Sequence, residues 1–108
     1  MAPQYYEGVG RRKTSTARVR IVTGNGKFLV NDKPVESFFT RVGDIDTAVG
    51  PIRVASLEGR LDVSAKVRGG GVTGQTAAVC QGLARALVSM DAELRTPLRS
   101  AGFLTRDA

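Results

Sequence analysis

The sequence has no histidine, no tryptophan and a single cysteine, Cys80, in 108 residues. Without histidine, the chain can form no Ser-His-Asp or Cys-His catalytic pair, no zinc site with histidine ligands and no imidazole base. One cysteine cannot form an internal disulfide or a metal site built from cysteines alone. Because Cys80 lies in an apolar stretch where nothing nearby would lower the pKa of its thiol, we expect a small buried residue and not a nucleophile.

Long apolar runs are missing as well. No stretch approaches the ~18–20 residues of a membrane span, and residues 1–6 have neither the basic region nor the apolar core of a signal peptide. Aromatic residues make up only 6% of the chain, so base stacking would be a minor part of any contact with nucleic acid. We therefore expect a cytoplasmic protein in a reducing compartment, with no membrane contact, no metal and no cofactor.

Positive charge, in contrast, is abundant and unevenly distributed. The chain has 16 Lys and Arg against 10 Asp and Glu, a net charge of +6. Two cationic groups stand out. The first consists of Arg11, Arg12, Lys13, Arg18 and Arg20, and the second consists of Arg60, Lys66 and Arg68, with Arg85 further along the chain. Such segregation is typical of proteins that bind a polyanion, most often a nucleic acid. A basic face that only keeps a protein soluble would have the same composition, so the positions of the charges must decide.

The length suits one domain with one modest core. No linker, repeat or low-complexity tract divides the chain, so we expect residues 1–108 to form a single domain. Residues 17–22 and 61–68 alternate small or apolar residues with polar or charged ones, which is the pattern of a half-buried strand. Residues 5–10 are expected to form a further strand before them.

Asn25-Gly26 separates the strand at 17–22 from a second β-rich run at 27–30. An Asn-Gly pair is a strong hairpin signal, because a type I′ turn needs a positive φ at both of its central residues. We therefore expect these two runs to pair as a hairpin. Residues 31–34 then form a turn that leads into a short helix at 35–39.

Three helical segments are expected in the rest of the chain. The last is a short one that covers residues 92–99, with Asp91 before it and Gly102 after it. Asp44 would cap a helix at 44–49 that Gly50-Pro51 ends, followed by a strand at 52–55. The strongest helix signal covers residues 76–90, with Thr73 as its N-cap. Its apolar stripe consists of Val79, Leu83, Ala86, Leu87 and Met90. Gly82 lies in mid-helix at a cost of ~1 kcal/mol relative to alanine, which suggests that another backbone approaches closely there.

These elements predict an α+β fold. A mostly antiparallel sheet packs its apolar face on the helix at 76–90. The opposite face would present Arg18, Arg20, Lys66 and Arg68 to solvent, if the strands that carry them share the sheet. The result would be a flat cationic surface.

A glycine-rich turn at residues 69–75 joins the strand at 61–68 to the long helix. Unpaired N–H groups at a helix N-terminus favour an anion, and glycines let it come close to the backbone. The spacing of Gly69, Gly74 and Thr76 approaches that of a P-loop, but Gln75 occupies the place of the essential lysine. No strand carries an acidic residue suited to Mg²⁺, so nucleotide hydrolysis is disfavoured. We favour anion contact over the alternative that the glycines merely permit a tight turn.

Five segments together resemble the universal S-nine family of small-subunit ribosomal proteins, in order and spacing across nearly the whole chain. They are residues 10–19, 24–27, 69–75, 82–87 and 101–107. Each motif alone is weak, whereas five in register are specific. Residues 41–57 match only loosely.

The resemblance implies the fold called ribosomal protein S-five domain-two-like, which is a four-stranded, mostly antiparallel sheet with helices packed on one face. It also implies a structural, non-catalytic protein in the head of the small ribosomal subunit. Its partners would be ribosomal RNA and neighbouring ribosomal proteins. The residues expected to bind RNA are Arg11, Arg12, Lys13, Thr14, Arg18, Arg20, Lys66, Arg68, Gly69, Gly70, Gly71, Gly74, Gln75, Arg85 and Arg106. Arg85 and Arg106 are weaker candidates, because either could instead pair within the protein.

Similar proteins continue past the Thr-Arg-Asp segment into a basic tail that reaches toward transfer RNA, and this chain stops at Ala108. We therefore expect that tail to be truncated, cleaved or naturally absent, and we assign a transfer-RNA contact to no residue. Two other functions stay open on the residues alone. One is a small nucleotide-dependent phosphotransferase, and the other is a free-standing RNA chaperone or regulator.

Overall fold

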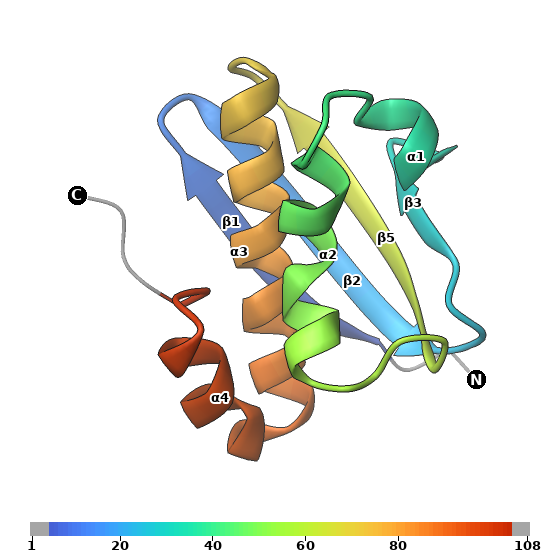
Figure 1. Ribbon diagram of the computed structural model, residues 1–108, viewed down its shortest axis with the longest axis vertical. Helices are drawn as coiled ribbons and strands as arrows, with labels where there is room; N and C mark the ends of the chain where they lie inside the picture. The colour runs from blue at the N-terminus through green and yellow to red at the C-terminus, as the bar shows by residue number, and fades with distance from the viewer. Residues whose placement is uncertain (1–4, 105–108) are drawn as a thin grey trace.

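The computed structural model describes residues 5–104. Its elements in chain order are β1 (Tyr6–Arg12), β2 (Ser15–Thr23), β3 (Phe28–Val30), β4 (Lys33–Pro34), α1 (Val35–Phe38), α2 (Asp44–Val54), β5 (Leu61–Arg68), α3 (Val72–Met90), the 3-10 turn η1 (Ala92–Leu94) and α4 (Arg95–Ser100). The strands form one mixed sheet in the order β1-β2-β5-β3-β4, and α2 and α3 lie side by side over one face of it (Figure 1). The predicted α+β class is confirmed, with the two-residue strand β4 as a fifth strand.

Strands β2 and β5 form the centre of the sheet, as their alternation predicted. They pair antiparallel, with Ala17 opposite Val67, Val19 opposite Ala65 and Ile21 opposite Val63. All six side chains are buried beneath the helices. Because successive side chains of a strand point to opposite faces, this register sends the residues between them to the solvent side.

The predicted hairpin between residues 17–22 and 27–30 is wrong, because β5 lies between β2 and β3. Strand β3 instead runs parallel to β5, with Phe28 opposite Val63. In the connecting turn Gly26 has a positive φ of 106° but Asn25 does not, so the type I′ geometry is not formed.

The side chain of Asp62, in β5, organises that turn. Its Oδ1 accepts hydrogen bonds from the backbone N–H groups of Asn25 at 3.0 Å, Gly26 at 3.2 Å and Lys27 at 2.9 Å. These bonds, that of Lys27 first, hold the pKa of the Asp62 carboxyl below its usual value. The turn is thus fixed to the inserted strand, which explains how the chain crosses β5 and pairs on its far side.

The predictions for residues 44–55 are also corrected, since α2 is one continuous helix that runs through Pro51. Ala48, Pro51 and Ile52 are buried at helical spacing, and their packing outweighs the one hydrogen bond that a proline removes. Gly43, with a φ of 88°, is the N-cap instead of Asp44. Asp44 forms an ion pair with Arg41 at 2.8 Å, and this bond lowers the pKa of the carboxyl.

Helix α3 confirms the predicted apolar stripe but begins four residues earlier than expected. Its N-cap is Gly71 and not Thr73, whose hydroxyl accepts a hydrogen bond from Arg41 at 2.9 Å. Of the five stripe residues, four are buried and Met90 is half-buried. Cys80 is buried as expected, and burial raises the pKa of its thiol to about 12, so the thiol is neutral at physiological pH.

The close backbone approach expected at Gly82 is confirmed, and the neighbouring backbone is β1. A Cβ added at Gly82 would lie 2.7 Å from Cγ2 of Val19 and 3.2 Å from the backbone of Gly8 and Gly10. In the other direction, a Cβ at Gly8 would lie 2.2 Å from the Gly82 carbonyl oxygen, and one at Gly10 would lie 1.8 Å from that of Ala78. Strand β1 and helix α3 therefore pack backbone to backbone.

The last described elements, η1 and α4, follow the end of α3. The predicted helix at 92–99 is divided into η1 and α4, and the side chain of Asp91 caps η1 by accepting a hydrogen bond from the Glu93 N–H at 3.0 Å. Leu98 is fully buried and fixes α4 to the core. Gly102, with a φ of 88°, then ends the helical segment as expected.

The β1–α3 contact predicts that Gly82→Ala destabilises the protein by about 1–3 kcal/mol. Helix propensity alone would make the alanine variant more stable by ~1 kcal/mol. A fall in the free energy of unfolding can therefore be attributed to the close contact. The measurement is urea unfolding followed by circular dichroism. Ser89→Ala, on the exposed face of the same helix, should stay within about 0.5 kcal/mol. A Gly82→Ala protein as stable as the native chain would contradict this packing.

The turn held by Asp62 predicts a pH-dependent effect of Asp62→Asn on the thermal midpoint. Because the folded state lowers the pKa of this carboxyl, its stabilising effect is present above about pH 4 and is lost as the pH falls through the lowered value. Asp62→Asn should therefore lower the midpoint at pH 7 and do so less at about pH 2.5. Glu36→Gln removes an exposed carboxylate of α1 and should have little effect at either pH. An equal loss from Asp62→Asn at both pH values would show that the carboxylate charge is not what holds the turn.

Candidate nucleic-acid interface

The face of the sheet opposite the helices collects cations from three strands. The register places Arg11, Thr16 and Arg68 in one row across β1, β2 and β5, and Val9, Arg18 and Lys66 in the next. Arg20 follows one row further along β2. We call the five exposed side chains on this side the cationic face: Arg11, Arg18, Arg20, Lys66 and Arg68. The sequence prediction that four of these share one solvent-exposed surface is confirmed.

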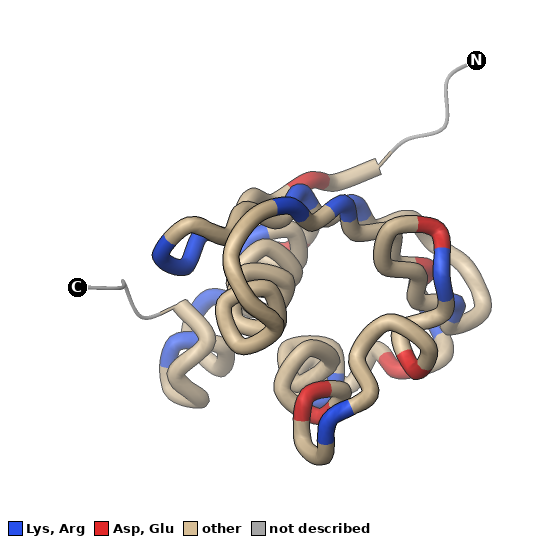
Figure 2. Tube along the Cα trace, turned by 90° about the horizontal axis from the view of Figure 1, so that it is seen from above, with Lys and Arg blue, Asp and Glu red and all other residues tan. Residues whose placement is uncertain are grey.

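The charges of the described residues are unevenly distributed over the fold. Seen from above, a series of Lys and Arg positions follows the outer side of the sheet and the turn between β1 and β2, whereas Asp and Glu lie mixed with further Lys and Arg toward β3, α1 and α2 (Figure 2). The net positive charge is therefore concentrated on the outer side of the sheet. A surface of this kind attracts a polyanion to one side of the molecule.

Two acidic residues flank the cationic face. Glu7 accepts a hydrogen bond from Arg20 at 2.7 Å and lies 3.9 Å from Arg18, while Asp32 pairs with Lys66 at 2.9 Å. The bond to Glu7 raises the pKa of Arg20, whose guanidinium also stacks 4.6 Å from the centre of the Tyr5 ring. Ion pairs this exposed are weak, so a phosphate can displace them at little cost.

Arg11 and Arg68 of the cationic face have no acidic partner among the described residues. Within residues 5–104, neither Arg11 nor Arg68 forms an ion pair. They lie in the same row on either side of Thr16. A hollow on this face is lined by Thr16, Arg18, Lys66 and Arg68 together with Val67. The cations are therefore available to an external anion.

The structure also brings the β1–β2 turn and the glycine-rich turn together. Gly69 and Gly70 take positive φ values of 78° and 64°, and they pack against Thr14 and Ser15. A Cβ at Gly69 would lie 2.4 Å from the Thr14 carbonyl oxygen, and one at Gly70 would lie 2.0 Å from Oγ of Ser15. Oγ of Ser15 donates a hydrogen bond to the Gly69 carbonyl at 3.0 Å.

This packing alone explains several of the glycines. A Cβ at Gly74 would also come within 2.7 Å of Oγ of Ser15. Gly71 is different, because a Cβ there would meet nothing within 4 Å. The glycine turn is thus rigidly seated on the β1–β2 turn, with one open position at the start of α3. The exposed turn residues Lys13 and Thr14 and the half-buried Arg12 lie beside it.

No side chain caps the N-terminus of α3, so the first turn keeps N–H groups that favour an anion. Two residues of the P-loop-like pattern are engaged inside the protein. Gln75 donates a hydrogen bond from Nε2 to the Gly69 carbonyl at 3.2 Å. Thr76 is buried and donates to the Val72 carbonyl at 2.8 Å, which leaves no hydroxyl directed at a metal ion. This geometry does not suit nucleotide hydrolysis.

Arg85 reaches back from α3 to the free edge of β1. Its Nη1 donates a hydrogen bond to the carbonyl oxygen of Val9. One helical turn earlier, Oε1 of Gln81 accepts a hydrogen bond from the Arg11 N–H at 3.3 Å. These two side chains satisfy backbone groups that an edge strand would otherwise expose. Arg85 thus has a structural partner, a backbone carbonyl and not an acidic side chain. Arg106 lies outside the described residues.

Sequence reasoning missed two further arginines. Arg95 and Arg99 lie on α4 and line a cleft together with Arg85 and Ser89. Their spacing of four residues places them on one side of the helix, which was the only local signal. The neighbouring Arg85 comes from a different helix, so the cluster appears only once α4 is packed on α3.

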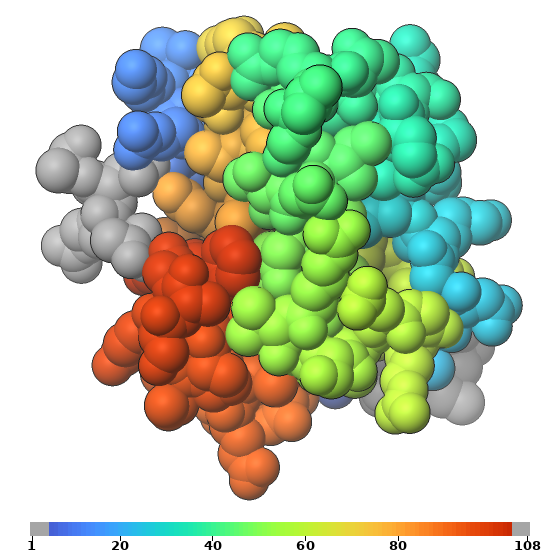
Figure 3. All heavy atoms as spheres, viewed as in Figure 1, coloured from blue at the N-terminus to red at the C-terminus, as the bar shows by residue number. Residues whose placement is uncertain are grey.

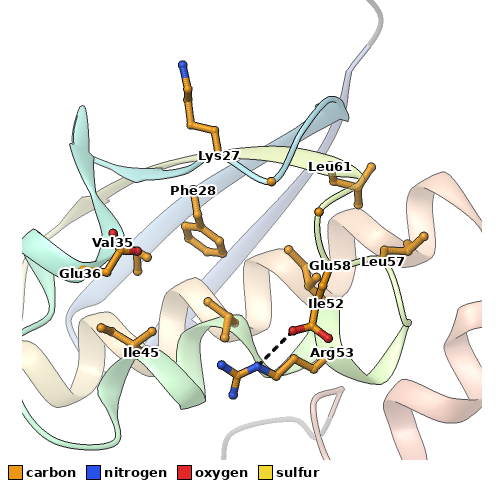
Figure 4. Close-up of a pocket in the computed structure, with 13 residues that line it drawn as sticks. Lys27, Phe28, Val35, Glu36, Ile45, Ile52, Arg53, Leu57, Glu58 and Leu61 are labelled. Carbon is orange, nitrogen blue, oxygen red and sulfur yellow. Dashed lines mark ion pairs between the residues drawn. The ribbon is translucent and has the colours of Figure 1, made fainter.

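A separate apolar hollow of about 250 Å³ lies at the other side of the sheet, between β3, α1 and α2. Phe28 points into it, with Val35, Ile45 and Ile52 around the ring (Figure 4). Arg53 and Glu58 form an ion pair at its rim, 3.7 Å apart. Its apolar wall and mixed charge do not suit a phosphate. The cationic face therefore remains the candidate nucleic-acid interface.

The described part of the chain offers neither a membrane segment nor a metal centre. Between residues 5 and 104 no helix is long and apolar enough to cross a bilayer. In the same range, no three His, Cys, Asp or Glu side chains are grouped as metal ligands.

Comparison with known proteins gives consistent matches over the whole interface. The family described as "Ribosomal protein S9/S16" matches residues 10–108. The "Small ribosomal subunit protein uS9" of Solidesulfovibrio magneticus is 48% identical over 108 residues, which cover 100% of this chain and 83% of the relative. Proteins of the same name from two strains of Dehalococcoides mccartyi are 46% identical over 103 residues, or 95% of this chain and 78% of each relative.

Proposed function

The chain belongs to the ribosomal protein S9 family, and we propose that it binds small-subunit ribosomal RNA through the cationic face and the adjoining β1–β2 turn. As a member of this family it is a structural constituent of the small ribosomal subunit and not an enzyme. It works within the ribosome, among ribosomal RNA and other ribosomal proteins. Because the similar proteins named above are bacterial, we propose that it works in the cytoplasm. Its place in the head of the subunit is a proposal that rests on the family resemblance.

One observation carries this proposal. Three separate segments of the chain bring unpaired or weakly paired cations into adjacent rows of one exposed sheet face, around Thr16. The planar guanidinium groups of Arg11, Arg18 and Arg68 can each bridge two phosphate oxygens. Phosphate groups that repel one another when RNA helices pack would be neutralised here, which is how a structural protein stabilises folded RNA.

The start of α3 adds a second kind of contact. Backbone N–H groups at the helix N-terminus bind an anion with no side chain to immobilise, and the open position at Gly71 lets an RNA phosphate approach them. Lys13 and Thr14 stand on the adjacent turn and can bind the same strand of RNA. The phosphotransferase alternative lacks support, because Gln75 and Thr76 are both occupied by bonds within the protein. We assign a contact with transfer RNA to none of the described residues.

Neutral replacement of Arg18 and Arg68 tests the cationic face. Every phosphate that the protein no longer neutralises should lower the slope of log K against log salt by about 0.7–0.9, so Arg18→Gln with Arg68→Gln should reduce it by roughly 1.5. The measurement is filter binding of a small-subunit RNA transcript from Solidesulfovibrio magneticus between 50 and 200 mM KCl. The thermal midpoint should hardly change, because both side chains are exposed.

Lys33→Gln with Arg60→Gln is the matched control, since it removes the same charge from exposed positions outside the cationic face. Its salt slope should stay close to that of the native chain. If both double variants reduce the slope equally, only the net charge matters and the cationic face is not the binding site. If the native chain shows no salt dependence, phosphate binding itself is refuted.

The glycine turn predicts that Gly71→Ala weakens binding of the same transcript while costing at most about 1 kcal/mol of stability. Its methyl group has room in the free protein, and at the N-cap position it would take up space beside the first turn of α3, where we expect the phosphate to bind. Gly71→Ser provides the control for helix capping, because serine is a better N-cap than alanine. It should restore stability and still weaken binding. Native affinity in both variants would show that this turn serves packing only.

A further inference from the structure

We propose that the cleft between α3 and α4 is a second phosphate-binding site for the same RNA, formed by Arg85, Arg95, Arg99 and the hydroxyl of Ser89. This inference rests on the proposed function and extends it to residues on the helical side of the molecule. The site lies outside the cationic face and the glycine turn. It would hold the RNA on two sides of strand β1.

The lining of the cleft is what an oxyanion requires. It consists of Arg85, Val88, Ser89, Arg95, Arg99 and Leu104, and it encloses about 400 Å³. Three of the lining residues are arginines, and no acidic residue is among them. Nor does any of the three arginines form an ion pair within residues 5–104. Like charges held together without a counter-charge are most stable when an anion lies between them.

Arg85 is already positioned for this task. Its bond to the Val9 carbonyl uses one of the five N–H donors of the guanidinium and restricts the side chain beside the edge of β1. The donors that remain can reach a ligand with less loss of side-chain entropy than a freely moving arginine would suffer. Arg95 and Arg99 stand four residues apart on α4, so both can contact the same group.

The cleft and the cationic face both adjoin strand β1, which favours RNA over an acidic protein as the ligand of the cleft. Arg85, which lines the cleft, bonds to the Val9 carbonyl, and Arg11 of the cationic face follows two residues further along β1, about 7 Å of strand. Viewed from the helical face, α4 and the β1–β2 turn lie along the same edge of the molecule (Figure 3). An RNA backbone that lies on the sheet can therefore pass the edge of β1 and enter the cleft.

The test compares three proteins. They are the α4 double variant, which carries Arg95→Gln and Arg99→Gln together, the native chain, and the Lys33→Gln, Arg60→Gln control. Arg85 is left intact because its bond to β1 is structural. We expect the α4 double variant to bind the Solidesulfovibrio magneticus transcript at least roughly tenfold more weakly at 100 mM KCl, with a salt slope lower by about 1–2. Its thermal midpoint should equal that of the native chain, since both side chains are exposed.

The possible results distinguish a failure of the cleft proposal from a failure of the proposed function. If the native chain binds with a steep salt slope and the α4 variant matches the control, the cleft is not an RNA site although the proposed function holds. If the native chain does not bind, the proposed function itself fails. If the α4 variant binds RNA normally but no longer sediments with assembled small subunits, the cleft binds a protein neighbour and the RNA assignment is overturned. Phosphate protection footprints that disappear only in the α4 variant would support it directly.

Discussion

The backbone contact between β1 and α3 is the constraint on which the rest of the interface depends. Gly8 and Gly10 on the strand and Gly82 on the helix leave no side chain between the two elements. Only at this distance can Gln81 and Arg85 reach the outer edge of β1 and bond to its backbone. A larger residue at any of the three glycines would push the strand outward and separate the rows of the cationic face as well.

The same strands divide stability and binding between their two faces. On the inner face, small and apolar residues of β1, β2 and β5 pack against the helices, and on the outer face Arg18 stands directly opposite Lys66. Like charges directly across a sheet are destabilising, so the free protein carries a repulsion that a bound phosphate would relieve. Glu7 and Asp32 at the borders reduce this repulsion without covering Arg11 or Arg68. Under the proposed function, RNA phosphates bound at this surface would remove the repulsion that remains.

The sequence allowed the central elements to be predicted because their periodicity is long and unbroken. The eight residues of β5 and the apolar stripe of α3 each specify one buried face, and Gly82 correctly indicated a close neighbour. The hairpin at Asn25-Gly26 failed because a local turn signal contains no information about Asp62, which lies 37 residues away and captures the turn. The break expected at Pro51 failed for a related reason, since burial of the proline and of Ile52 compensates for the hydrogen bond that proline cannot donate. The arginine cleft required the placement of α4 on α3, which no local pattern determines.

The absence of histidine has a functional consequence once the interface is placed on the fold. Every cation of the cationic face and of the α3–α4 cleft is an arginine or a lysine, residue types that stay charged throughout the physiological pH range. Binding through such a surface responds to salt and hardly to pH. A site that lost charge near neutral pH would let packed RNA phosphates repel one another again. The RNA binding proposed for both surfaces should therefore keep its strength throughout the physiological pH range.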